Sequence, residues 1–289
     1  MQKKYIDLHT HTCLSDGVFT PSQLCNTAQE AGIGILSITD HNYTENLSVL
    51  QAEFPNIQLI QGAEISCLYS TADNMEHEIH IVALGFDMNT PEINDILSHN
   101  QPNRAPYINA ILDRLRTCGI DLGNYDDLCK LYPGKRHIGR MDIARILREQ
   151  KFVDTVDQAF DIYIGAHGER KAYVPNPLRY ISMEKAIQAI IHSGGVAVLA
   201  HLYYYQLNDF NNELLLKEFK KLAGSHGAIE VFYKRYNQDQ CDKLKLLADK
   251  YNLMYSAASD FHGQSERETL NNQFSKLSCS KLLKRLGVD

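Results

Sequence analysis

The chain of 289 residues is 44% hydrophobic and 22% charged, so it can bury a substantial core, and its composition excludes a disordered protein. A formal net charge of −6 argues against broad electrostatic binding to duplex DNA or an anionic membrane, although a local basic patch could hold a small phosphate ligand. Seven cysteines without a Cys-x-x-Cys pair fit a reducing compartment, and no apolar run approaches the length of a membrane span, so we expect a cytoplasmic protein.

Short strand-like runs alternate with helical stretches in the first third of the chain. A strand over 5–9 comes first, and Thr20-Pro21-Ser22-Gln23 then has the pattern of a capping box with proline at the first helical position. This pattern predicts a helix that runs to about Ala31 and is ended by Gly32. Buried strands are predicted next, over 35–39, 57–61 and 79–84.

The same alternation returns in the last third. We predict helices over 183–192 and 238–251, and strands over 196–200, 228–232 and 254–259. About seven strands result, and because most alternate with helices, parallel β/α connectivity is the simplest arrangement. The fold class is therefore α/β, either a β/α barrel or an open sheet, and seven units favour a distorted barrel.

Residues 91–175 interrupt the alternation. Apolar residues recur there at helical spacing, with little strand signal between them. We therefore predict one α/β domain over 1–90 and 176–289, with a helical insertion over 91–175. The insertion contains the basic and polar residues Lys135, Arg136, His137 and Arg140, and a cap of this kind over the strand ends could bind a substrate.

Histidines and acids recur where the predicted strands end. They are His9, His11, Asp16, Asp40, His41, Glu64, His80, His201, Asp260 and His262. The carboxyl ends of parallel strands meet at one edge of a sheet, so these side chains are expected to converge. Imidazole and carboxylate without thiolate form the ligand set of hydrolytic zinc, manganese or iron sites. The pattern predicts a hydrolase with several metal ions.

The ordered set of motifs resembles the PHP (polymerase and histidinol phosphatase) superfamily over nearly the whole chain. The resemblance rests on segments 5–12, 15–17, 38–41, 62–64, 195–201 and 259–263, with His80 and 84–85. Within the superfamily, 139–145 and 171–175 resemble the stand-alone phosphoesterases that act on nucleotides and short RNA. The resemblance implies a distorted seven-stranded β/α barrel, with two or three divalent Mn, Fe or Zn ions at the strand ends.

Roles for individual residues also follow from the resemblance. One metal is expected on His9, His11 and Asp260, a second on His80 and His201 with Glu64 as the bridge, and a third on Asp16, His41 and His262. Two cations about 3.5–4 Å apart would share a hydroxide that attacks phosphorus.

Other side chains are expected to assist this reaction. Arg140, Arg136 and Lys171 are candidates for binding the phosphate and offsetting its charge in the transition state. Asp40 is expected to accept an N–H from a ligand imidazole and so fix its orientation. Glu230, within a predicted strand, could support a ligand or form a buried ion pair.

The chain departs from the pattern of the phosphoesterases that it resembles at two places that concern the substrate. Asp142 stands where a histidine is common, and a free carboxylate there would repel a phosphate; His137 could substitute. An aromatic run, Tyr203 to Tyr205, stands where proline usually follows the histidine that matches His201. This run could stack a base or could pack in the core.

The leading hypothesis is a metal-dependent phosphoesterase that acts on small nucleotides or short oligoribonucleotides, as a nucleoside 3',5'-bisphosphate phosphatase or a 5'-3' exoribonuclease does. One alternative is a phosphatase of small metabolites, such as histidinol phosphatase. Another is a non-catalytic metal-binding module. The sequence does not determine the metal, the preference for monoester or diester, the oligomeric state or the pathway.

Overall fold

The computed structural model describes residues 5–101, 103–166, 168–175, 179–264, 268–271 and 273–288. Contacts divide the chain into two units: the first contains Met1–Thr12, Gly17–Asn100 and Arg179–Asp289, and the second contains Cys13–Asp16 and Gln101–Leu178. The first unit includes 91–100, which we had placed in the insertion. The predicted boundary at 176 lies outside the described residues.

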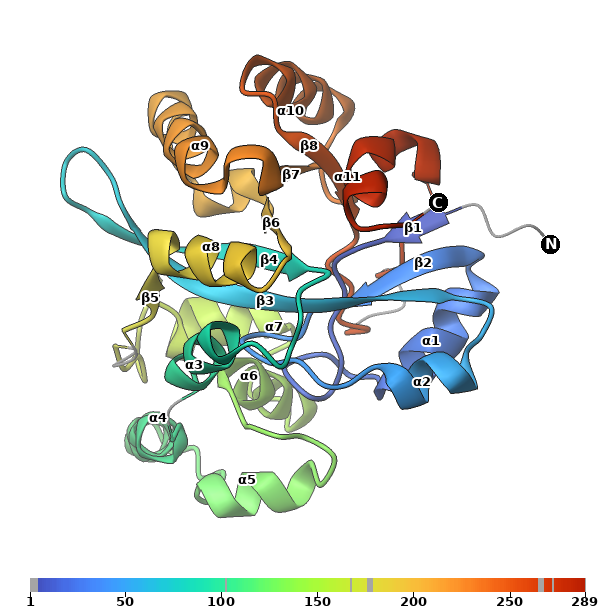
Figure 1. Cartoon of the computed structure of the whole chain (residues 1–289). Helices are drawn as coiled ribbons and strands as arrows, with labels where there is room; N and C mark the ends of the chain where they lie inside the picture. Colours follow the sequence, from blue (N-terminus) through green and yellow to red (C-terminus); the bar gives the residue numbers. More distant parts are fainter. Residues whose placement is uncertain are drawn as a thin grey trace. The chain divides into compact units, whose positions relative to one another are not determined.

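The first unit contains an eight-stranded sheet (Figure 1). Its order is β1 (Tyr5–Asp7), β2 (Ile33–Ile38), β3 (Gln58–Ser70), β4 (Glu76–Leu84), β6 (Val196–Leu199), β7 (Gly227–Tyr233) and β8 (Met254–Ala258), while β5 (Ile181–Ser182) pairs with β3. The pairs are parallel except that β4 runs antiparallel to both β3 and β6. The predicted α/β class with a mostly parallel sheet is confirmed.

The predicted barrel of seven strands is not confirmed. The described residues contain eight strands, and their regular ladders run from β1 to β8 without a β1–β8 ladder. Three backbone hydrogen bonds nevertheless join the segments that follow β1 to the end of β8: Leu8 N to Ala257 O (3.0 Å), Asp260 N to His9 O (2.9 Å) and His11 N to Phe261 O (2.8 Å). They bring the ends of the first and last strands together.

Two strands are longer than the sequence indicated. We expected one strand over 57–61, ending near Glu64, and another over 79–84. Instead β3 continues to Ser70 and β4 begins at Glu76, because 62–70 pairs with 76–84 in an antiparallel ladder. Glu64 and His80 therefore lie inside strands rather than at strand ends. The far end of the β3–β4 hairpin is rich in polar residues, so apolar runs in the sequence do not indicate its full length.

Helices of the first unit surround the sheet. They are α1 (Pro21–Glu30), α2 (Ser48–Glu53), α3 (Pro91–His99), α8 (Met183–His192), η2 (Leu202–Tyr205), α9 (Asp209–Ala223), η3 (Gly224–His226), α10 (Gln238–Lys250), η4 (Lys276–Cys279) and α11 (Ser280–Arg285). The predicted capping box of α1 is present, with Thr20 and Gln23 each bonding the other's backbone N–H. Every residue of β6 and β7 is buried, as expected for strands covered on both faces.

The second unit is helical in its described residues. It contains α4 (Ala105–Thr117), α5 (Tyr125–Leu131), α6 (Arg140–Glu149), α7 (Val156–Ala159) and the π-helical turn η1 (Phe160–Ile164). Its own core includes Ile111, Leu115, Ile143 and Leu147, which belong to the predicted helical pattern. Across both units, no helix that the structure describes is long and apolar enough to cross a membrane.

Candidate metal centre

The first unit brings together all the predicted metal ligands except Asp16. His9 and His11 follow β1, His41 follows β2, Glu64 lies in β3, His80 lies in β4, His201 follows β6, and Asp260 and His262 follow β8. The two strand-interior ligands are adjacent because Ser66, two residues after Glu64, pairs with His80 across the antiparallel ladder. Sheet register thus places segments that are distant in sequence around one point.

The carboxylate of Glu64 lies at the centre of this cluster. Its two oxygens face five imidazole nitrogens: Oε2 lies 3.4 Å from His9 Nε2, 3.3 Å from His11 Nε2 and 3.0 Å from His41 Nδ1, while Oε1 lies 2.9 Å from His80 Nδ1 and 3.0 Å from His201 Nε2. Glu64 is buried. A carboxylate with separate histidines on each oxygen has the geometry needed to bridge two cations.

Within the described residues of the first unit, two groups of donor atoms are compact enough to hold an ion. His9, His11 and Asp260 form the first, with donor atoms within 4.8 Å of one another. The two Nε2 atoms of the histidines are 3.0 Å apart, and Asp260 Oδ1 lies 3.5 and 3.2 Å from them. This is the first group that the sequence analysis predicted.

The second group in the first unit consists of His41, Glu64 and His80. The third metal that the sequence analysis expected on Asp16, His41 and His262 stays a prediction. The ring of His262 stacks on that of His11, with 4.2 Å between centroids. His41 therefore contributes to the region around the bridging carboxylate.

Unsatisfied buried atoms indicate that these residues fit metal ions. Glu64 Oε2 and His201 Nδ1 are buried and have no hydrogen-bond partner within the described part of the chain. Buried polar atoms are normally satisfied, so buried nitrogen and oxygen atoms that lack a partner within such a cluster suit a bound ion. Nitrogen and oxygen donors of this kind match Zn, Mn or Fe.

The electrostatics of the cluster favour added positive charge. Burial alone would raise the pKa of Glu64, but the imidazoles of His80, His41 and His9 lower it well below its usual range. Burial would conversely lower the pKa of His80, yet Glu64 and Glu78 raise it to about 10. The carboxylates thus favour the protonated form of His80, and a divalent cation would compete with that proton.

Two further residues, Glu230 and Tyr233, orient candidate ligands through hydrogen bonds. Glu230 Oε1 lies 2.6 Å from His9 Nδ1, and its Oε2 accepts the backbone N–H of His201 (2.7 Å). Tyr233 donates its hydroxyl to Asp260 Oδ2 (2.9 Å), which leaves Oδ1 toward the histidines. The sequence analysis considered Glu230, an acid in a predicted strand, as a support for a ligand, but no pattern in the sequence indicated a role for Tyr233.

The carboxylate of Asp40 has a backbone and side-chain partner that the sequence did not indicate. Its carboxylate accepts the backbone N–H and the hydroxyl of Thr12, at 2.8 and 2.6 Å, and so ties the segment after His11 to the end of β2. The bond from a ligand imidazole that we predicted stays a prediction. Asp7 performs a similar task for β8, because it accepts from Ser259 N and Oγ, and burial raises its pKa to about 6.

Ligand-bearing strands end in strained backbone. His201, Asp260 and Asn42 are non-glycine residues with φ values of 23°, 54° and 52°. Such conformations cost about 1–3 kcal/mol each and persist where the surrounding structure enforces them. Asn42 is held by hydrogen bonds with Ser66 and Asn100. Three of the strained residues therefore lie at or directly beside candidate ligands.

The aromatic run after His201 divides between packing and exposure. The hydroxyl of Tyr205 accepts from His80 N (2.9 Å) and donates to Ala200 O (2.9 Å). Tyr203 packs edge-on against Tyr236, with centroids 5.2 Å apart. Tyr204 is 55% exposed. Packing and hydrogen bonding therefore account for Tyr203 and Tyr205, whereas neither explains the exposure of Tyr204.

The remaining predicted site residues lie in the second unit. The backbone carbonyl of Asp16 accepts from Arg145 Nη2 (2.6 Å), and Arg140 is the first residue of α6. Lys171 is exposed and pairs with Glu169 (2.7 Å). Asp16 as a metal ligand, and Arg136, His137, Arg140 and Lys171 as substrate contacts, stay predictions.

His137 and Asp142 have surroundings that the sequence did not reveal. Burial and the charges of Arg104 and Arg136 lower the pKa of His137 to about 4, so its imidazole is neutral at pH 7. Asp142 is buried and accepts from Gly139 N (2.9 Å), Lys135 Nζ (2.5 Å) and Arg145 Nη1 (3.0 Å). The expected repulsion of phosphate assumed a free carboxylate, whereas two cations balance this one.

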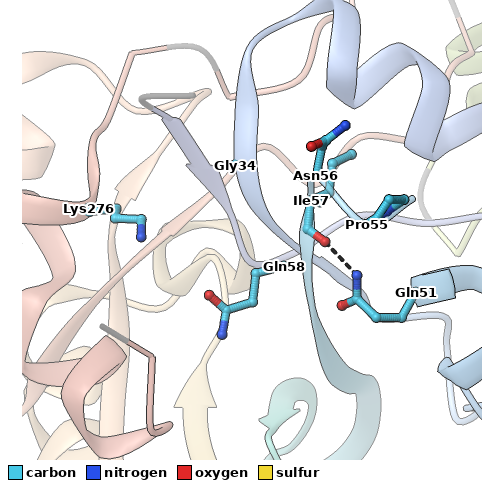
Figure 2. A pocket seen from close by; sticks show the side chains of 7 residues that line it. All are labelled: Gly34, Gln51, Pro55, Asn56, Ile57, Gln58 and Lys276. Carbon is cyan, nitrogen blue, oxygen red and sulfur yellow. Dashed lines mark hydrogen bonds between the residues drawn. The ribbon is translucent and has the colours of Figure 1, made fainter. Parts of the chain in front are cut away.

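Figure 2 shows a pocket elsewhere in the first unit. Its volume is about 470 Å³, and its lining consists of Gly34, Gln51, Pro55, Asn56, Ile57, Gln58 and Lys276. Gly34 and Gln58 lie at the beginnings of β2 and β3, whereas His41 follows the end of β2 and Glu64 lies in the middle of β3. The lining holds no histidine or carboxylate, so we assign it no chemistry.

Known proteins resemble this chain over nearly its whole length. A family model described as the PHP domain matches residues 7–276. The 5'-3' exoribonuclease Rnm of Salmonella typhimurium is 35% identical over 261 residues, which cover 89% of this chain and 84% of the relative. The 3',5'-nucleoside bisphosphate phosphatase of Chromobacterium violaceum is 30% identical over 263 residues, covering 90% and 88%.

Solved structures show the same fold. A Chromobacterium violaceum protein described as an amidohydrolase, with bound sulfate, matches with a TM-score of 0.81 and 27% identity over 97% of this chain and 96% of that one. A Bifidobacterium adolescentis protein assigned as a metal-dependent phosphoesterase matches with a TM-score of 0.78 and 26% identity, over 98% and 96%.

Proposed function

Since the chain belongs to the PHP domain family, we propose that it is a metal-dependent phosphoesterase that hydrolyses phosphate esters of small nucleotides or short oligoribonucleotides. The observation that carries this proposal is the buried carboxylate of Glu64, whose two oxygens face five histidines. The names of the relatives, an exoribonuclease and a bisphosphate phosphatase, support the substrate class.

The ligands would hold two or three divalent ions, for which Mn, Fe and Zn are the candidates. Bound ions of this type lower the pKa of a water molecule and neutralise charge on phosphate oxygens. The protein supplies the orientation: Glu230 fixes the ring of His9, and Tyr233 fixes the carboxylate of Asp260. Such support keeps ligand atoms in place during the reaction.

Substrate contacts from the second unit are part of the proposal. Arg136, Arg140 and Lys171 would bind phosphate, with His137 as a further contact. The buried Nε2 of His137 has no hydrogen-bond partner among the described residues. The positive charges of Arg104 and Arg136 help to lower the pKa of this imidazole. The Chromobacterium violaceum structure contains bound sulfate, an oxyanion like phosphate, which supports the proposal of a phosphate site in this chain.

The direct test is hydrolysis by the purified, Mn²⁺-loaded protein. Adenosine 3',5'-bisphosphate tests monoester cleavage, and short 5'-phosphorylated RNA tests diester cleavage. We expect turnover that His9→Ala reduces by at least about 1000-fold, because it removes a ligand of the metal centre. His192→Ala, at an exposed histidine, is the matched control and should leave turnover unchanged.

Absence of turnover above the His9→Ala level with Mn²⁺, Fe²⁺ and Zn²⁺ would refute the proposal. Preferential cleavage of histidinol phosphate in a panel of simple monoesters would instead indicate a metabolite phosphatase. Stoichiometric metal without turnover on any ester would indicate a non-catalytic module. A cytoplasmic location also stays a prediction, which cell fractionation can test.

A further inference from the structure

One side chain at the edge of the metal centre has an unusual combination of exposure and contact. Tyr204 is 55% exposed, and it lies three residues after His201 in the short helix η2. Its ring is edge-on to the ring of His201, with centroids 5.7 Å apart, and 6.2 Å from that of Tyr233. Tyr204 therefore lies against a metal ligand on one side and is open to solvent on the other.

The hydroxyl of this tyrosine contacts a cationic side chain from the segment after β7. Arg235 follows β7, and its Nη1 donates to the hydroxyl of Tyr204 (2.8 Å). Its Nη2 lies 3.5 Å from Glu268 Oε1, and that same carboxylate accepts the backbone N–H of His262 (2.8 Å). Arg235 thus connects the segment that bears His201 with the segment that bears His262.

The guanidinium has donors left over for a ligand. An arginine offers five N–H donors, and the described residues take one through Tyr204 and one weakly through Glu268. Its side chain is 44% exposed. Partial burial would lower the pKa of Arg235, but Tyr233, Asp260 and Tyr204 raise it, so the group stays charged.

We propose that Arg235, held by Tyr204 and Glu268, binds a phosphoryl group of the substrate at the rim of the metal centre. The assignment rests on the proposed phosphoesterase function. A planar guanidinium with fixed orientation matches the oxygens of a phosphate in a bidentate manner, which a mobile lysine does not. Glu268 is already engaged by two backbone N–H groups, His262 N and Gln264 N, so it neutralises Arg235 only in part.

The test compares Arg235→Gln with wild type by two measurements on Mn²⁺-loaded protein. The first is kcat/KM for adenosine 3',5'-bisphosphate, and the second is the Kd of orthophosphate by calorimetry. Losing a charge-assisted hydrogen bond should lower kcat/KM and weaken orthophosphate binding by about 10- to 100-fold. Metal content should not change, because Arg235 is not a ligand.

Three further variants separate phosphate binding from a structural role. Arg235→Lys should recover part of the lost affinity, and Tyr204→Phe, which removes one anchor of the guanidinium, should have a smaller effect than Arg235→Gln. Arg179→Gln is the matched control, because Arg179 is an exposed arginine that pairs with a single acid, Glu76. It should behave like wild type.

The two proposals fail in different ways. If wild type lacks turnover, the phosphoesterase function fails, while the orthophosphate affinities still decide the role of Arg235. If Arg235→Gln binds orthophosphate within about two-fold of wild type, well under 1 kcal/mol, the assignment is overturned. Loss of metal from Arg235→Gln and Arg235→Lys alike would also overturn it, in favour of a structural role.

Discussion

Replacing Asp142 by alanine should strongly destabilise the second unit. The carboxylate forms ion pairs with Lys135 and Arg145, whose side chains are only 6% and 8% exposed. It also accepts the backbone N–H of Gly139, the residue before α6. Asp142→Ala would leave two buried cations without their carboxylate and one helix-terminal N–H without its acceptor.

The size of the effect follows from these contacts. Removing one partner of a buried ion pair costs about 3–5 kcal/mol, because the remaining charge is uncompensated. Loss of the helix-terminal hydrogen bond adds about 1 kcal/mol. Arg145 keeps its hydrogen bond to Asp16 O, which offsets part of the loss. We expect the free energy of unfolding to fall by about 3–5 kcal/mol in total.

Urea unfolding followed by circular dichroism measures this loss, and hydrogen exchange of peptides from α6 localises it. Local measurement is needed because the two units need not unfold together. The double variant Asp142→Ala with Lys135→Met removes one uncompensated charge. It should recover about 1–3 kcal/mol relative to Asp142→Ala alone, since the two residues are in contact.

A matched control comes from α5. Asp127 occupies the same position in the capping box of α5 and also pairs with a lysine, Lys130, but these side chains are exposed. Asp127→Ala should therefore cost much less. The reasoning fails if Asp142→Ala is no more destabilising than Asp127→Ala, or if Lys135→Met gives no recovery in the double variant.

Other predictions concern the metal centre. Glu64→Gln should lower metal affinity by at least about 100-fold, measured by calorimetry, and unchanged metal content would contradict the bridging role. Although burial alone would lower their pKa values, nearby carboxylates raise those of His9 and His80, the latter to about 10. Metal must displace these protons, so affinity should rise with pH from 6 to 9; titrations in buffers of different ionisation enthalpy should show proton release, and a flat profile would contradict it. A Cβ on Gly17 would lie 2.6 Å from His11 O, so Gly17→Ala should lower stability by about 1–3 kcal/mol in thermal unfolding, whereas an unchanged Tm would show that the loop adapts.

Local patterns explain why much of the fold was predictable. The capping box of α1, the helix α8 and the strands β6, β7 and β8 lie within one or two residues of their predicted positions. Capping, apolar periodicity and glycine stops act over a few residues, so neighbouring sequence is sufficient. The same holds for the apolar stripes of α4 and α6, which form the core of the second unit.

Pairing between distant segments explains what was missed. The antiparallel orientation of β4 depends on its ladders with β3 and β6, which no local pattern records. The ladder with β4 extends β3 past Glu64, and the short strand β5 pairs with this extension and brings the described sheet to eight strands. The neutralised carboxylate of Asp142 and the anchored guanidinium of Arg235 likewise depend on contacts made by folding.

The sequence by itself determined the chemistry available to this protein, because the donor atoms are properties of the side chains: imidazole nitrogens and carboxylate oxygens, without thiolates. Only the tertiary structure decided which donors meet. His9 and Glu230 are 221 positions apart, yet their atoms lie 2.6 Å from each other. Sheet register and packing determine which histidines contact Glu64 and which acids hydrogen-bond to those histidines. Both depend on contacts between segments that are far apart in the sequence, so no local pattern predicts them.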